Sequence, residues 1–289
     1  MKLKEVRAKW DALQSNSSSL RSREAATAIG CSEAELVASG CGSQQVLALD
    51  LAQLPKGLGE LARMGSWLWL LRNEASVLEV DAPIELQSSE PKQLLFSGEK
   101  LSIEIDREAI DSAFYVETSK WLKRSIQLFD KAGEAILKIY LRDSRRTEAA
   151  DQWAQALALE AIPSQLELTE LATRFPVTTL HTETRSIPQQ AYRQLLESAR
   201  DLNCPVTIQA ANNGGYLRVQ AIPRTLKSID SWFNILDPGL NLHLREEWIS
   251  EAWSSRRGDQ LDVNFGPTRN QPALTLSFPT NSPLSSILP

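Results

Sequence analysis

The chain has 289 residues, of which 42% are apolar and 23% charged, a composition typical of a globular protein with a sizeable core. A net charge of −5 at pH 7 disfavours general nucleic-acid binding, which depends on neutralising phosphates. No apolar run approaches the roughly 20 residues that a membrane-spanning helix needs, and the charged N-terminal residues are unlike a secretory signal. Two histidines and three scattered cysteines predict reduced thiols in the cytoplasm and no zinc site.

The N-terminal part of the chain predicts helices ahead of any strand. Residues 1–13 have the apolar spacing of an amphipathic helix. Residues 20–39 predict two short helices, the second opened by a capping box of Ser32 and Glu35. This pair also resembles a DNA-reading helix-turn-helix, but its second helix carries Glu33 and Glu35, which phosphate repels, so DNA binding is the weaker interpretation.

A strand-rich segment follows. A helix is expected to open at Leu54 and Pro55, because proline suits the first helical turn. A short helix is expected at 108–114 and a longer one at 148–161. Alternating apolar residues predict strands at 66–71, 76–80, 101–105, 125–129 and 135–140, with a turn at 130–133 between the last two.

Part of this segment occurs twice, since residues 66–118 align with 205–257 without a gap. Such a long period indicates a duplicated domain rather than a solenoid unit. The expected fold is α+β, a tandem duplication of an antiparallel β-sheet domain with flanking helices, with repeats at 1–160 and 161–289. Identical pairs include Asn73 and Asn212, Leu78 and Leu217, Val80 and Val219, Glu108 and Glu247, Ile110 and Ile249, and Ala113 and Ala252.

The second copy is shorter at both ends. It lacks a counterpart of the N-terminal helices, and it ends in FPTNSPLSSILP where the first copy has the helix at 148–161. Its own helix is expected after Ile187 and Pro188, with Ser186 as N-cap. The apolar face expected for this helix comprises Tyr192, Leu195, Leu196, Ala199 and Leu202.

Four runs of residues resemble one family: 23–39, 71–80, 124–140 and 231–257. They are similar to the bacterial haemin-degrading and haem-trafficking family with the HemS/ChuX domain, and the likeness covers most of the chain in order. The resemblance implies a cytoplasmic protein of two stacked-sheet repeats. Members take up haem from an importer and store it, pass it to a haem oxygenase, or open its ring.

The resemblance also implies a ligand set. In the family an axial histidine lies on a helix early in the second repeat, which falls in the segment that this chain lacks, and a distal arginine aligns with Glu104. His181, in the shortened linker, is the candidate metal ligand, with a solvated loop histidine as the alternative. His243, Arg256 and Arg257 are the other candidate haem-binding residues. The alternatives are a hydrogen-bonded structural histidine and a solvated arginine pair.

The leading hypothesis is a haem carrier or storage protein in haem-iron utilisation. It implies haem as the bound group, with a haem importer or haem oxygenase as protein partner, and neither nucleic acid nor a membrane span. A carrier is favoured over an oxygenase-like enzyme because a carboxylate at Glu104 disfavours the anionic oxygen species that ring opening requires. The alternative from another class is a degenerate relative that binds no haem and serves as an interaction or regulatory protein.

Overall fold

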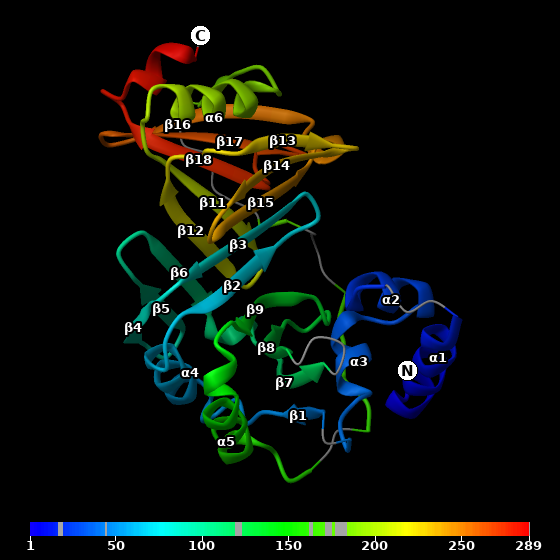
Figure 1. Ribbon diagram of the computed structural model, residues 1–289. Helices are drawn as coiled ribbons and strands as arrows, with labels where there is room; N and C mark the ends of the chain where they lie inside the picture. Colours follow the sequence, from blue (N-terminus) through cyan, green and yellow to red (C-terminus); the bar gives the residue numbers. More distant parts are fainter. Residues whose placement is uncertain are drawn as a thin grey trace. The chain divides into compact units, whose positions relative to one another are not determined.

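The computed structural model describes residues 1–16, 20–43, 45–118, 123–161, 164–170, 175–176 and 184–288. Its strands form two antiparallel sheets of nine strands each (Figure 1). The helices are α1 (Leu3–Asn16), α2 (Ser22–Ile29), α3 (Glu33–Ala38), α4 (Leu54–Arg63), α5 (Thr147–Leu157) and α6 (Ala191–Asp201). Short 3-10 turns are η1 (Arg107–Ala109), η2 (Ser144–Arg146), η3 (Glu246–Trp248) and η4 (Pro283–Ile287).

Each sheet contains strands from both halves of the sequence. The first sheet runs in the order β1 (Val46–Ala48), β7 (Ser112–Thr118), β8 (Lys123–Phe129), β9 (Ala135–Leu141), β2 (Trp67–Arg72), β3 (Ser76–Ala82), β15 (Leu240–Arg245), β14 (Trp232–Asp237) and β13 (Leu226–Ile229). The second runs in the order β10 (Thr184–Ser186), β16 (Glu251–Arg257), β17 (Gln260–Gly266), β18 (Leu274–Pro279), β11 (Val206–Asn212), β12 (Gly215–Ala221), β6 (Leu101–Asp106), β5 (Gln93–Ser97) and β4 (Glu85–Ser89).

These two strand orders confirm the tandem duplication. Strands β1-β7-β8-β9-β2-β3 of the first repeat occupy the same places in one sheet as β10-β16-β17-β18-β11-β12 of the second repeat in the other. The remaining strands are exchanged: β15-β14-β13 complete the first sheet and β6-β5-β4 complete the second. Leu78 on β3, for example, lies opposite Leu242 on β15. The division of the repeats between residues 160 and 161 stays a prediction.

The backbone forms two compact units, which are described separately. The first unit comprises Met1–Leu68, Glu85–Leu94 and Ile105–Ala172, and the second comprises Trp69–Ile84, Leu95–Glu104 and Thr173–Pro289. In the first unit, α1 and α3 cover one face of β7, β8 and β9. Leu3, Ala34 and Val37 pack there on Phe114, Val116 and Phe129.

The opposite side of the first unit carries α4 and α5. Trp153 on α5 donates a hydrogen bond from Nε1 to the carbonyl of Gly57 on α4, at 2.8 Å. Asp151 on α5 accepts from the Tyr115 hydroxyl at 2.5 Å and from Arg124 Nε at 3.1 Å. These partly buried polar contacts attach α5 to β7 and β8, because each donor satisfies the Asp151 carboxylate.

In the second unit, α6 lies across one face of β16, β17 and β18 (Figure 1). The Tyr192 ring meets Phe265 of β17 edge-on at 5.5 Å and Phe233 of β14 at 5.4 Å. The Tyr192 hydroxyl donates to Glu246 Oε1, which Arg193 also contacts at 2.6 Å. Aromatic edge-to-face packing and a shared carboxylate therefore fix α6 in place.

Most predicted elements are confirmed, and three details are corrected. The segment 108–114 is not a helix: η1 ends at Ala109 and strand β7 begins at Ser112. Ser186 is not an N-cap, since it ends β10 and the cap position of α6 is Gln190. Leu202 is 54% exposed because α6 ends one residue earlier. Among the described helices, none has the length and hydropathy of a membrane span.

Candidate functional site: a polar sheet face in the second unit

The second sheet has one apolar and one polar side, because successive side chains of a strand point to opposite faces. On β11 and β12 the apolar side carries Ile208 and Leu217, which are fully buried. Registered neighbours on the other side are polar: Gln209 lies opposite Arg218, and Asp262 opposite Ser277. We call this side the polar face and define it by Glu104, Gln209, Tyr216, Arg218, Arg257 and Asp262, all in the second unit.

Tyr216 and Glu104 form the central pair of the polar face. The Tyr216 hydroxyl on β12 donates a hydrogen bond to Glu104 Oε2 on β6 at 2.6 Å. Both side chains are half-buried. Burial of the phenol and its hydrogen bond to Glu104 raise the pKa of Tyr216 to about 12, against the opposing effect of Arg218 and Arg257. The phenol is therefore protonated at neutral pH and has a proton acceptor in direct contact.

Arg218 supports this pair from the same strand. Its guanidinium carbon lies 4.7 Å from the centre of the Tyr216 ring. Nε and Nη2 both donate to Gln209 Oε1, at 2.9 and 2.6 Å. A cation held over an aromatic ring in this way interacts favourably with the ring's electrons. The guanidinium is thus fixed by one neutral acceptor and one ring, without a carboxylate partner of its own among the described contacts.

A second cation lies at the β16–β17 end of the polar face. Arg257 donates from Nε to Asp262 Oδ2 at 3.2 Å, and its side chain is 54% exposed. The other oxygen of Asp262, Oδ1, is buried without a hydrogen-bond partner among the described residues. Beside it, Thr275 donates to Asn264 Oδ1 at 2.9 Å. This end of the polar face therefore offers an exposed guanidinium and a carboxylate with unused hydrogen-bonding capacity.

The structure does not gather the predicted haem-binding residues into one place. Arg257 is on the polar face, whereas neighbouring Arg256 points to the opposite side of β16 and donates to the carbonyl of Gly258. His243 lies on β15 of the other sheet, where its Nδ1 is 2.7 Å from Asn234 Oδ1. That contact is the hydrogen bond expected of a structural histidine. His181 lies outside the described residues, so its role stays a prediction.

The structure also bears on the helix-turn-helix interpretation of residues 20–39. Both helices form, and Ser32 accepts from the backbone N–H of Glu35 as the capping box predicts. Every residue of α3 from Glu33 to Ala38 is buried. Glu33 pairs with Lys138 at 2.5 Å rather than facing solvent. The helix that a helix-turn-helix uses to read DNA is here part of the core of the first unit.

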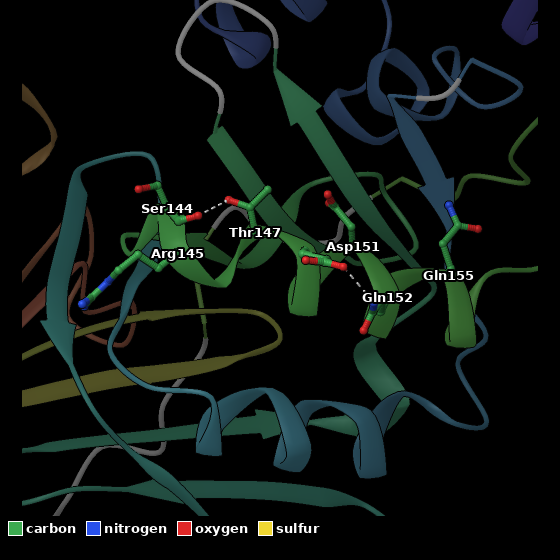
Figure 2. A pocket seen from close by; sticks show the side chains of 7 residues that line it. Ser144, Arg145, Thr147, Asp151, Gln152 and Gln155 are labelled. Atoms are coloured by element: carbon green, nitrogen blue, oxygen red, sulfur yellow. Dashed lines mark hydrogen bonds between the residues drawn. The ribbon is translucent and has the colours of Figure 1, made fainter.

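A hollow of about 670 Å³ lies on the first unit, and it is a weaker candidate (Figure 2). Figure 2 shows its lining side chains extending from η2 and the exposed side of α5, among them Arg145, Thr147 and Gln155. Asp151, its central carboxylate, is already bonded to Tyr115 and Arg124. Arg145 is similarly engaged with Asp143 at 2.9 Å. The described residues contain no cluster of three metal-ligating side chains here or elsewhere.

Tyr216 and Arg218 are the residues that the sequence analysis missed. In the alignment of the two copies, Tyr216 corresponds to Val77 and Arg218 to Glu79, so the side-chain chemistry differs between the copies at both positions. The Glu104 and His243 pair is another such position. Comparing outward-facing positions between the two copies, rather than searching for histidines, is the signal that points to the polar face.

The duplicated sheets and their polar face define a class of tandem-repeat α+β protein. The haemin-degrading HemS/ChuX domain model matches residues 30–159 and 169–263, and the chain belongs to that family. Hemin transport protein HmuS of Yersinia pestis is 26% identical to the chain, over 81% of this chain and 79% of that protein.

Solved structures share this fold over nearly the whole chain. Holo-PhuS, a heme-binding protein from Pseudomonas aeruginosa, is similar with a TM-score of 0.85 and 22% identity, covering 98% of this chain and 95% of that one. ChuS, a heme degrading enzyme of Escherichia coli O157:H7, is similar with a TM-score of 0.81 and 20% identity, covering 95% and 93%. At such identities the likeness supports the fold.

Proposed function

We propose that this chain binds haem at the polar face and carries it without opening the ring. The observation that carries the proposal is the Tyr216–Glu104 pair, held at 2.6 Å on a half-buried sheet face that also carries the Arg218 and Arg257 guanidinium groups. The named relatives support haem as the bound group, since HmuS is described as a hemin transport protein and PhuS as heme-binding.

The donor set of the polar face fits haem chemistry. Haem propionates are anions for which arginine is the preferred partner, because its planar fork matches a carboxylate. Arg257 is exposed, and among the described residues Arg218 has the neutral Gln209 as its one hydrogen-bond acceptor, so both guanidinium groups suit a propionate. Ferric iron accepts oxygen donors such as a tyrosine phenol. The predicted contributions of His181, His243 and Arg256 are further parts of this proposal.

We prefer haem carriage to ring opening because the polar face does not supply the positive charge that ring opening requires near Glu104. Ring opening requires negative charge to develop on oxygen next to the iron, and donors of positive charge or hydrogen bonds must stabilise it. Glu104 is an acceptor on the polar face, where the family resemblance implies an arginine. Glu104 supplies no positive charge to stabilise such a build-up and is engaged with Tyr216, so the bound ring is expected to remain intact.

A haemin titration of the full chain, followed by optical absorption, tests the proposal. We expect saturable binding and transfer of the haem to added apomyoglobin. Incubation of the complex with ascorbate and oxygen is expected to leave the haem spectrum unchanged. Formation of a ring-opened product would establish an oxygenase instead. Failure to saturate would support the alternative of an interaction or regulatory protein that has lost haem binding.

A further inference from the structure

The polar face contains a phenol with its own proton acceptor, and this arrangement has a consequence for iron. Tyr216 is half-buried, and its hydroxyl points to a carboxylate on the neighbouring strand, 2.6 Å away. A phenol is a poor ligand while it keeps its proton, and ferric iron binds the phenolate oxygen. A carboxylate in direct contact with the hydroxyl can accept this proton when a metal ion binds the phenol oxygen.

We propose that Tyr216 is the axial oxygen ligand of ferric haem in this chain, with Glu104 as the acceptor of its proton. The inference rests on the proposed haem binding and assigns the iron ligand within it. On binding, the O–H bond of Tyr216 breaks and a bond forms between Oη and the iron. The proton passes to the Glu104 carboxylate, so charge and atoms balance without any further reactant.

The surrounding charges fit the two states of the phenol. Before iron arrives, Tyr216 keeps its proton and donates it in the 2.6 Å hydrogen bond to Glu104. After the proton moves, the phenolate lies beneath the Arg218 guanidinium, 4.7 Å from the ring centre, and Glu104 is neutral. The neutral Glu104 then donates a hydrogen bond to Oη of Tyr216 and orients this oxygen. Residues hydrogen-bonded to metal ligands commonly orient them in this way.

The first repeat contains a similar pair that serves as the matched control. Tyr115 donates to Asp151 at 2.5 Å, but its side chain is 4% exposed and Arg124 also binds that carboxylate. The pair attaches α5 to the first sheet, and both of its groups are engaged in that attachment. Tyr115→Phe therefore removes a tyrosine–carboxylate hydrogen bond elsewhere in the same molecule.

The experiment compares ferric haem complexes of the full-length wild-type chain, Tyr216→Phe, Glu104→Gln and Tyr115→Phe. Electron paramagnetic resonance and resonance Raman spectra report a phenolate ligand directly, and near-ultraviolet circular dichroism verifies folding. We expect the phenolate signature in the wild type and in Tyr115→Phe and its loss in Tyr216→Phe. Glu104→Gln is expected to keep the signature and weaken haemin binding about 10–100-fold, as loss of a partner of a metal ligand does.

Three results would overturn the inference. A wild-type complex without a phenolate signature, or a signature that persists in Tyr216→Phe, leaves haem binding intact but assigns another ligand. A histidine signature that disappears in His181→Ala or His243→Ala identifies that ligand. Absence of saturable haemin binding in the wild type rejects both this inference and the proposed function.

Discussion

In the first repeat, strand β9 places Lys138 beneath the N-terminal helices, where its ammonium group meets Glu33 at 2.5 Å and both side chains are buried. In the second repeat, the aligned position on β18 is Thr275, which donates a hydrogen bond to Asn264 within its own sheet. A buried cation needs a partner from a covering element, whereas a threonine satisfies itself locally. The described part of the second repeat contains no counterpart of α1 to α3, and the change to Thr275 is consistent with that.

The two tyrosine–carboxylate pairs show the same contrast. Tyr115 and Asp151 are joined by Arg124 and Glu117 in a partly buried network of the first unit. Tyr216 and Glu104 are half-buried and have Arg218 stacked alongside instead of a second ion pair. The same chemical pair thus fastens a helix to the first sheet and lies half-buried on the polar face of the second sheet.

The largest expected effect is at the covered face of the first repeat. Lys138→Met removes the cation and leaves Glu33 buried without its charge partner, which typically costs about 3–5 kcal/mol of stability. Urea unfolding followed by circular dichroism measures the loss. The double variant Lys138→Met with Glu33→Gln is expected to recover part of it. A loss below about 1 kcal/mol would show that this pair does not hold the helices to the sheet.

The turn between β8 and β9 also lies against α3, so a substitution in this turn is a second test of how the N-terminal helices pack on the first sheet. Gly133 has φ of 76°, and a Cβ added there would lie 2.6 Å from the Cβ of Ser32. Gly258 in the β16–β17 turn has φ of 63° with no atom within 4 Å of an added Cβ. We expect Gly133→Ala to lower the unfolding free energy by more than Gly258→Ala, which carries only the backbone penalty of about 1 kcal/mol. Equal losses in the two variants would contradict the packing of α3 against this turn.

The titration of Tyr216 sharpens the comparison between the two pairs. Its raised pKa means that it contributes stability that is fully present below about pH 10 and is lost as the pH rises through about 12. Glu104→Gln removes the negative charge next to the phenol, so the pKa is expected to fall below about 12, while burial, the larger cause of the rise, stays in place. Ultraviolet difference absorption of ionised tyrosine, compared with the wild type, measures this shift. An unchanged titration curve would mean that the pair does not form in solution.

The smallest expected effect is at His243. Its Nδ1 contact with Asn234, at 2.7 Å on a half-buried strand, is that of a structural hydrogen bond. His243→Ala is expected to cost about 1 kcal/mol of stability, the typical net contribution of such a bond. The absorption spectrum of the haemin complex should be unaltered. A changed spectrum would place His243 at the iron and exclude the structural role.

Local patterns made much of the fold predictable. Alternation of apolar residues located β3, β6, β8 and β9, and the capping box located the start of α3. The error at 108–114 has a physical cause: β7 is covered on both faces, so Ala113, Phe114, Tyr115 and Val116 are all buried, and such a run carries no alternation. The exchange of strands was not predictable, because alternation fixes which face is buried but not which strand pairs with which.

The candidate site was less predictable than the fold. Tyr216 acquires its role from Glu104, which is 112 residues away in sequence and becomes its neighbour only through the pairing of β12 with β6. The sequence points to Glu104 through its charge and to the two histidines through their chemistry. It does not place a tyrosine against that carboxylate, since the strand exchange that brings the two together cannot be predicted from alternation.

Amide hydrogen exchange of the full chain, with and without haemin, tests most directly whether the polar face provides the binding surface. We predict that haemin slows exchange in β6, β12 and the β16–β17 hairpin, which carry the polar face. Strands β8 and β9, whose matching face lies under the N-terminal helices, are predicted to exchange at unchanged rates. Slower exchange confined to β8, β9 and α3, with none in β6 or β12, would contradict the assignment of the polar face.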